Sequence, residues 1–314
     1  MFYPTISVVI TAYNRKEYLE EALQSLELQT FEKDRFEVVL MTNFDFSYDT
    51  LLNLSVYNIG TCTVGEMLSK ALTNSKGSII AFLDDDDMFE RNKLEKLHNI
   101  FIENPSIIYY HNAQNFVNNS GKLVNNGTSV LSGILTSEEL IRDLPKLLKR
   151  HKIGELFFNL SSCAIKKEVY LDKSSELSKI KGHTDDFMFF SALNGDNNLY
   201  YDKERLTLYR IHDSSSRIKG AVKALHSQRG ISLYEDLSIS TLTILNMVEN
   251  QTLKSVLYCR LVKESTRLLH LSKDRDRLKI NLNIQLLSKY VKFDSGSVFN
   301  RYMLLLYYIF IYVT

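Results

Sequence analysis

The stretch IIAFLDDDDMF, residues 79–89, places five apolar residues directly before four consecutive aspartates. A short apolar run is typical of a strand that is covered on both faces of a sheet. Four adjacent ionised carboxylates repel one another, so they need either water or a divalent cation between them. Their oxygen ligands favour Mg²⁺ or Mn²⁺, and Mg²⁺ is usually shared with substrate phosphates. The stretch predicts either a metal–diphosphate site or a solvated acidic turn, with Asp87 capping a helix that begins near Met88.

The sequence around this stretch alternates between strand and helix patterns. Apolar, β-branched runs predict further strands at residues 6–11, 36–41 and 54–57. Segments of helical periodicity predict helices at residues 14–28, 64–74 and 88–103. This alternation predicts an α/β fold, a Rossmann-like, mostly parallel sheet sandwiched by helices. Ligands bind beyond the carboxyl ends of strands in such sheets, where we expect residues 84–87, 11–15 and 42–43.

Beyond residue 105 the pattern is mixed and then becomes helical. We expect strands at 107–110 and 206–211, a turn at 118–121, and helices at 137–150 and 185–193. From about residue 217 the strand signals fade into long amphipathic stretches. We therefore expect two regions, residues 1–216 and a helical extension at 217–314.

Composition limits the number of domains, the role of the cysteines and the compartment that we expect for the protein. The 314 residues, 45% of them hydrophobic, suffice for one large domain or two smaller ones. The cysteines Cys62, Cys163 and Cys259 form no Cys-x-x-Cys pair, so a zinc site or a disulfide framework is not expected. The first apolar run has no basic segment before it and is too short for a signal peptide. These features predict a cytoplasmic protein.

Charge is unevenly distributed along the chain. Residues 216–301 carry 15 lysines and arginines against 7 aspartates and glutamates, whereas the remainder carries 23 against 30. The basic region suits an anionic partner such as membrane headgroups, or it is a solvated helical surface. The apolar run YMLLLYYIFIYV, residues 302–313, is shorter than the about 20 residues that span a bilayer. It predicts peripheral contact with the cytoplasmic membrane face, packing on the protein itself, or a homodimer; no nucleic-acid partner is expected.

Three motifs together resemble a known enzyme family. They are ISVVITAYNRKEYLEEALQSL (6–26) followed by GSIIAFLDDDDMF (77–89), then GHTDDFMFF (182–190), and then LTLYRIHDSSSR (206–217). In this order and spacing they resemble the nucleotide-sugar-dependent glycosyltransferases of family 2, which have the GT-A fold. The resemblance covers roughly residues 4–217 and implies that residues 1–216 form the catalytic domain. It implies an inverting, metal-dependent transfer of a sugar, with a UDP-sugar as the expected donor, to a hydroxyl of a glycan or a lipid-linked acceptor.

The resemblance assigns roles to the acidic residues. Asp84 becomes the first acid of a D-x-D motif, on the nucleotide side, and Asp86 becomes the second acid and a ligand of Mn²⁺ or Mg²⁺. Asp85 is expected to support donor binding, although Asp85-x-Asp87 is also a D-x-D frame. His212 is expected either to complete the metal shell or to be a hydrogen-bonded loop histidine.

Two further aspartates, Asp185 and Asp186, replace the glutamate–aspartate pair of the family. A carboxylate at a helix start can act as the general base that deprotonates an acceptor hydroxyl, and Asp186 occupies the base position. The alternative is a favourable acidic charge at the first turn of a helix.

Donor contacts are expected from the loop after the first strand. Tyr13 would pack on the base, Thr11 would offer backbone contacts, and Arg15 would be a phosphate contact or a surface residue. Asn43 stands where the family often has a base-binding aspartate, and Lys70 is the cation that remains where relatives carry an arginine–asparagine pair. Arg210 is expected to pair with phosphate or with Asp185.

Two other classes of protein stay open. A non-catalytic nucleotide- or glycan-binding relative would keep the fold and lack turnover. A sugar-nucleotidyltransferase would need a glycine-rich loop after the first strand, and TAYNRKEY contains no glycine.

Overall fold

The computed structural model describes residues 4–127, 131–149, 153–212 and 228–272. The chain divides into two compact units. One unit runs to Ser137 and continues from Glu155 to Ile218; the other comprises Glu138–Gly154 and the chain from Lys219 onward. The acidic stretch and the sheet belong to the first unit.

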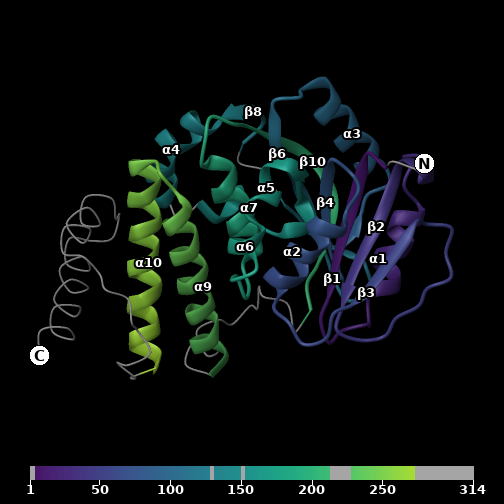
Figure 1. Ribbon diagram of the computed structural model, residues 1–314, viewed down its shortest axis with the longest axis horizontal. Helices are drawn as coiled ribbons and strands as arrows, with labels where there is room; N and C mark the ends of the chain where they lie inside the picture. Colours follow the sequence, from purple (N-terminus) through teal and green to yellow (C-terminus); the bar gives the residue numbers. More distant parts are fainter. Residues whose placement is uncertain (1–3, 128–130, 150–152, 213–227, 273–314) are drawn as a thin grey trace, which may run out of the picture. The chain divides into compact units, whose positions relative to one another are not determined.

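The first unit is built on one sheet with the order β3-β2-β1-β4-β9-β6-β10-β5, with β7 beside β6 and β8 beside β10. The strands are β1 (Ile6–Ala12), β2 (Phe36–Thr42), β3 (Leu54–Asn58), β4 (Ile79–Asp84), β5 (Met88–Phe89), β6 (Ile107–Val117), β7 (Leu123–Asn126), β8 (Gly133–Thr136), β9 (Cys163–Lys166) and β10 (Asn198–Arg210). Strands β1 to β4 pair in parallel, and β6 pairs in parallel with β10. Because β9 runs antiparallel to both β4 and β6, it joins these two parallel groups in one common direction. Figure 1 shows β1, β2 and β3 side by side with α1 beside them.

Helices cover both faces of this sheet. They are α1 (Leu19–Glu27), α2 (Val64–Asn74), α3 (Lys93–Glu103), α5 (Lys167–Leu171), α6 (Ser174–Leu177) and α7 (Thr184–Leu193). Apolar side chains of α1 and α3 form one buried core with alternate residues of β1, β2 and β4, such as Val8 and Val38. Helix α2 contacts β1 and β2, and α7 contacts β6. The expected mostly parallel α/β sheet between helices is confirmed.

Strand register brings the expected ligand-binding residues to one edge. Thr11 of β1 pairs with Asp84 of β4, and Ala12 pairs with Thr42 of β2. On the other parallel pair, Arg210 of β10 lies opposite Val117 of β6. The acidic stretch, the loop after β1 and the end of β2 therefore follow from neighbouring strand ends, as parallel pairing requires.

Two helices begin later than the sequence pattern indicates. Helix α1 starts at Leu19 because Asn14 adopts a left-handed φ of 57°, which a continuous helix cannot contain. Helix α3 starts at Lys93, and Met88 and Phe89 instead form β5, which pairs with β10. The expectation that Asp87 caps a helix near Met88 is therefore wrong.

The second unit is helical in its described part. Its helices are α4 (Ser137–Lys149, shared at Ser137 with the first unit), α9 (Gln228–Met247) and α10 (Gln251–Ser272). Helices α9 and α10 pack side by side (Figure 1), and buried Glu264 accepts hydrogen bonds from Thr241 on α9 and Arg260 on its own helix. None of the helices in the described part of the chain is long and apolar enough to cross a membrane. The apolar run at residues 302–313 lies outside the described residues.

Candidate active site at the carboxyl edge of the sheet

The four aspartates form a tight turn directly after β4. The N–H of Asp87 donates to the carbonyl of Asp84 at 3.2 Å, and the N–H of Asp84 donates to Oγ of Ser161 at 2.9 Å. One carboxylate oxygen from each of Asp84, Asp86 and Asp87 lies within 4.8 Å of the others. The turn therefore gathers three carboxylates at the edge where the parallel strands end.

Burial makes these acids hold their protons more tightly. Burial raises the pKa of Asp85 to about 6, although Arg15 opposes the rise. Burial, followed by the charges of Asp86 and Asp85, also raises the pKa of Asp84. Burial likewise raises the pKa of Asp87 well above its ordinary value. A cation placed among these carboxylates would favour their ionised forms, so its binding would release protons.

Arg15 supplies the positive charge that faces this turn. Its Nη2 contacts Oδ1 of Asp85 and lies 2.8 Å from Oδ2 of Asp86. Its Nε donates to Oδ2 of Asp85 at 3.2 Å, which makes the contact with that carboxylate bidentate. Burial alone would lower the pKa of Arg15, but the bond to Asp85 and the surrounding carboxylates raise it. Arg15 is therefore an ion-pair partner of the acidic turn rather than an isolated surface residue.

His212 contacts the same carboxylate oxygen of Asp86 as Arg15 does. Its Nε2 lies 2.7 Å from Oδ2 of Asp86 and 3.2 Å from Nη1 of Arg15. The ring also packs at 5.5 Å from that of Tyr18. The structure thus brings Asp86, His212 and Arg15 together, although the three come from distant parts of the chain.

The carboxylate of Asp87 has one satisfied and one open oxygen. Its Oδ1 accepts the backbone N–H of Arg210 at 2.9 Å. Its Oδ2 is buried and has no hydrogen-bond partner among the described residues. The nearby hydroxyl of Ser161 offsets part of the rise in the pKa of this carboxyl. A buried acceptor without a donor normally costs free energy. Oxygen donors from Asp84, Asp86 and Asp87, with the imidazole of His212, fit a hard divalent cation, and the open oxygen is what such an ion would satisfy.

The acidic pair on α7 lies close to this turn. The charge of Asp185 contributes to the raised pKa of Asp84, after burial and the nearer carboxylates. Asp185 Oδ1 accepts the N–H of Asp186 at 3.0 Å, at the first turn of the helix. Asp186 is buried, and the helix begins after His183, which has a left-handed φ of 59°. The sequence motif thus places one acid toward the turn and the other within the first turn of α7.

The residues expected to contact the sugar donor differ in exposure and in hydrogen bonding. Tyr13 follows β1 and is 37% exposed. Asn43 is engaged with Asn14: its Oδ1 accepts the Asn14 N–H at 2.8 Å and its Nδ2 donates to Asn14 Oδ1 at 2.6 Å. Lys70 is exposed on α2, and within the described part of the chain its side chain makes no hydrogen bond or ion pair. The geometry does not bring Lys70 to the acidic turn.

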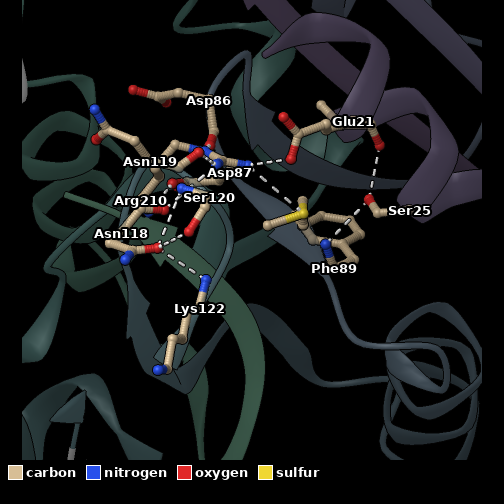
Figure 2. A network of polar contacts seen from close by, with 12 residues as sticks. Glu21, Ser25, Asp86, Asp87, Phe89, Asn118, Asn119, Ser120, Lys122 and Arg210 are labelled. Atoms are coloured by element: carbon tan, nitrogen blue, oxygen red, sulfur yellow. Dashed lines mark hydrogen bonds and ion pairs between the residues drawn. The ribbon is translucent and has the colours of Figure 1, made fainter. Parts of the chain in front are cut away.

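Two residues support the turn from behind: Arg210, which sequence analysis expected to pair with phosphate or with Asp185, and Glu21, which it missed. The side chain of Arg210 has no exposed area and pairs with Glu21 of α1 at 2.7 Å rather than facing a ligand. Figure 2 shows Arg210 between Asp86, Asp87, Glu21 and the turn at Asn118–Asn119. Glu21 carries no signal of its own in the sequence, because only the packing of α1 against β5, which pairs with β10, brings it there.

Comparison with known proteins decides the family. The model of glycosyl transferase family 2 matches residues 7–172, just over half of the chain. The chain belongs to glycosyl transferase family 2. The match contains nearly all of β1, the loop with Arg15 and the whole acidic turn, whereas α7, Arg210 and His212 lie beyond it.

Relatives of this family 2 glycosyltransferase include uncharacterized proteins and one named enzyme. An uncharacterized glycosyltransferase of Haemophilus influenzae is 26% identical over 75% of this chain and 78% of its own. An uncharacterized glycosyltransferase of Rickettsia conorii is 30% identical, but this chain spans 22% of it. The poly(ribitol-phosphate) β-N-acetylglucosaminyltransferase TarS of Staphylococcus aureus is 31% identical over 28% of this chain and 17% of its own.

Solved structures share the fold at low identity. A crystal structure of S. aureus TarS 1–349 with UDP-GlcNAc has a TM-score of 0.57 and 17% identity, over 91% of this chain and 78% of that one. The mannosyltransferase PcManGT of Pyrobaculum calidifontis, with GDP-Man and Mn²⁺, has a TM-score of 0.53 and 13% identity, over 99% and 81% of the two chains. The likeness establishes the GT-A fold for the family 2 chain.

Proposed function

We propose that this glycosyltransferase uses a nucleoside-diphosphate sugar, with a UDP-sugar as its donor, in a metal-dependent and inverting reaction. The acceptor would be a hydroxyl of a glycan or of a lipid-linked molecule. The observation that carries the proposal is the cluster of three carboxylate oxygens within 4.8 Å, beside His212 and Arg15, at the carboxyl edge of the sheet.

Asp84, Asp86, Asp87 and His212 are the residues that would hold Mn²⁺ or Mg²⁺. When bound, such an ion supplies charge stabilisation for the departing nucleoside diphosphate. Arg15 would hold a diphosphate oxygen, because its guanidinium already faces the same turn. Tyr13 and the backbone around Thr11 would contact the nucleoside, and Asp85 would keep Arg15 in place through its bidentate contact.

Asp186 would remove the proton from the acceptor hydroxyl as it attacks the sugar carbon opposite the diphosphate. In that step the hydroxyl oxygen forms the new bond, the bond to the diphosphate breaks, and the diphosphate leaves with the electron pair. Asp185 orients this acid by accepting its backbone N–H. A carboxylate in this role contributes about 10²–10⁴-fold to the rate.

The nucleotide base is the least constrained part of the donor. The TarS structure contains UDP-GlcNAc and the PcManGT structure contains GDP-Man, so the fold accepts both uridine and guanosine. Asn43 would read the base edge with the hydrogen-bonding capacity that its pairing with Asn14 leaves over.

A thermal-shift screen of UDP, GDP and TDP with and without Mn²⁺ tests the site and the base together. We expect metal-dependent stabilisation by UDP, slow hydrolysis of a UDP-sugar, and loss of both in Asp86→Ala. Asp186→Ala should abolish transfer and leave donor binding intact, whereas Asp196→Ala, in an exposed loop, should change neither. Metal-dependent UDP binding without turnover on any acceptor would favour the non-catalytic relative. Binding of a nucleoside triphosphate with release of pyrophosphate would favour the nucleotidyltransferase.

For the remainder of the chain we propose that residues 1–216 carry catalysis and that the basic region 217–314 serves the acceptor side. Contact of the run at 302–313 with the cytoplasmic membrane face would bring a lipid-linked acceptor near. Liposome flotation with and without residues 301–314 tests this, and an unchanged flotation combined with a loss of dimer would assign the run to self-association.

A further inference from the structure

We propose that Arg210 is a positioning residue for the acidic turn and that it fixes Asp86 and Asp87 for metal binding from behind the site. The inference rests on the proposed metal-dependent function. The side chain of Arg210 is completely buried, so it is not open to solvent. Whatever it contributes must therefore pass through the residues that it holds.

The guanidinium of Arg210 is saturated by its surroundings. Arginine offers five N–H donors in a fixed planar fork. Five acceptors lie within hydrogen-bonding distance of them. They are the carbonyl of Asp86 (2.9 Å), the carbonyls of Asn118 (3.4 Å) and Asn119 (2.5 Å), Oε2 of Glu21 (2.7 Å) and Sδ of Met88 (3.8 Å). A lysine at this position would present three donors from a single nitrogen and would leave buried carbonyls without partners.

Arg210 contacts two of the three metal-site aspartates, one through its side chain and one through its backbone. The Nε–H of Arg210 fixes the backbone of Asp86, whose carboxylate faces His212 on the other side. The backbone N–H of Arg210 occupies Oδ1 of Asp87, while Oδ2 is buried without a hydrogen-bond partner among the described residues. One residue thus holds the backbone of Asp86 and the carboxylate of Asp87 through different atoms, and Figure 2 shows it beside both.

The same side chain also supports His212. The guanidinium carbon of Arg210 lies 4.3 Å from the ring centroid of Tyr18, and that ring packs at 5.5 Å from His212. Cation–π contact of this kind favours one placement of the tyrosine ring. Arg210 therefore connects α1, the β6–β7 turn and the acidic turn.

Hydrogen bonds within residues 118–122 shape the turn that contacts Arg210. Oδ1 of Asn118 accepts the N–H groups of Ser120 and Lys122, at 3.1 and 2.9 Å, so the carbonyls of residues 118 and 119 are directed at the guanidinium. Asn118 is half-buried, and its carbonyl accepts from Arg210, so substitution of its side chain is a second way to perturb the same network.

The test measures Mn²⁺ affinity by electron paramagnetic resonance, well below the unfolding temperature of each protein. We expect Arg210→Lys to weaken Mn²⁺ binding about 10–100-fold, in the range known for residues that orient metal ligands. Asn118→Ala should weaken it in the same direction by less. Arg205→Lys, the same substitution at an exposed position of β10 that donates to the carbonyl of Gly127, should leave the affinity unchanged.

The outcomes separate this inference from the proposed function. No Mn²⁺ binding by the unchanged protein overturns the metal-dependent function, and the role of Arg210 falls with it. Normal affinity in Arg210→Lys, with a lowered unfolding temperature, assigns Arg210 a structural role and overturns the inference alone. Where Arg210→Lys does not fold, Asn118→Ala decides: unchanged affinity in that variant overturns the inference, and weakened affinity at an unchanged unfolding temperature supports it.

Discussion

Nε2 of His212 lies 2.7 Å from Oδ2 of Asp86, although 126 residues separate them in the chain. Neither side chain is exposed by more than 14%. The pair joins the end of β10 to the turn after β4. This contact brings an imidazole and a carboxylate together within the candidate site.

If this pair holds a divalent cation, His212→Gln should weaken Mn²⁺ binding about tenfold or more, because an imidazole that faces the ion is lost. Isothermal titration with Mn²⁺ alone measures this effect. His98→Gln, on the helix α3, is the control and should bind Mn²⁺ normally. Equal affinities for all three proteins would exclude His212 from the metal site.

Arg15 neutralises the turn when no other cation is present. We expect Arg15→Gln to lower the unfolding temperature of the metal-free protein, because Asp85 and Asp86 then repel one another without a counter-charge. Added Mn²⁺ should raise the unfolding temperature of this variant by more than it raises that of the unchanged protein. Arg35→Gln, which alters a surface pair with Glu32, should show the ordinary increase. A smaller increase in Arg15→Gln would mean that Arg15 helps the metal to bind instead of substituting for it.

Asp85 should leave a signature in the pH dependence of stability. Burial raises its pKa from the ordinary 3.8 to about 6, so in this window the folded chain binds more protons than the unfolded chain. The free energy of unfolding should therefore fall as the pH rises from about 4 to 6. Asp85→Asn removes this contribution, which is on the order of 1–3 kcal/mol.

The measurement is urea unfolding in EDTA between pH 4 and 7, expressed as the difference between variant and unchanged protein. The difference is needed because burial lowers the pKa of His111 to about 4, so His111 costs stability as the pH falls from 6.5. That contribution is common to both proteins and cancels. A difference curve that stays flat across the window would contradict the raised pKa of Asp85.

Gly65 marks a close approach between α2 and the segment before α7. A Cβ at this position would lie 2.2 Å from the carbonyl oxygen of Leu177 and 2.3 Å from that of Ile180. Gly65→Ala should therefore destabilise the protein by about 1–3 kcal/mol, because backbone atoms must move. Gly154→Ala, where a Cβ meets nothing within 4 Å, should have little effect. Urea unfolding midpoints compare the two, and equal midpoints would contradict the close contact.

Much of the fold could be predicted from periodicity. The runs at Ile6–Ala12 and Phe36–Thr42 are buried on both faces, and continuous apolar stretches of that length predict such strands. The start of α3 could not be predicted in this way. Met88 and Phe89 fit an amphipathic helix, but pairing with β10 satisfies their backbone as a strand, and that partner lies more than a hundred residues away.

The candidate site, like the fold, could be predicted from the sequence only in part. The sequence by itself determined that carboxylates would stand at the end of a buried strand, because an apolar run followed by four aspartates ends at the ligand edge of a parallel sheet. Only the tertiary structure decided which side chains surround these carboxylates. Arg15, His212, Arg210 and Glu21 reach the turn through strand pairing and helix packing between distant segments. Such long-range contacts depend on where whole elements pack, and no local pattern of residues carries that information.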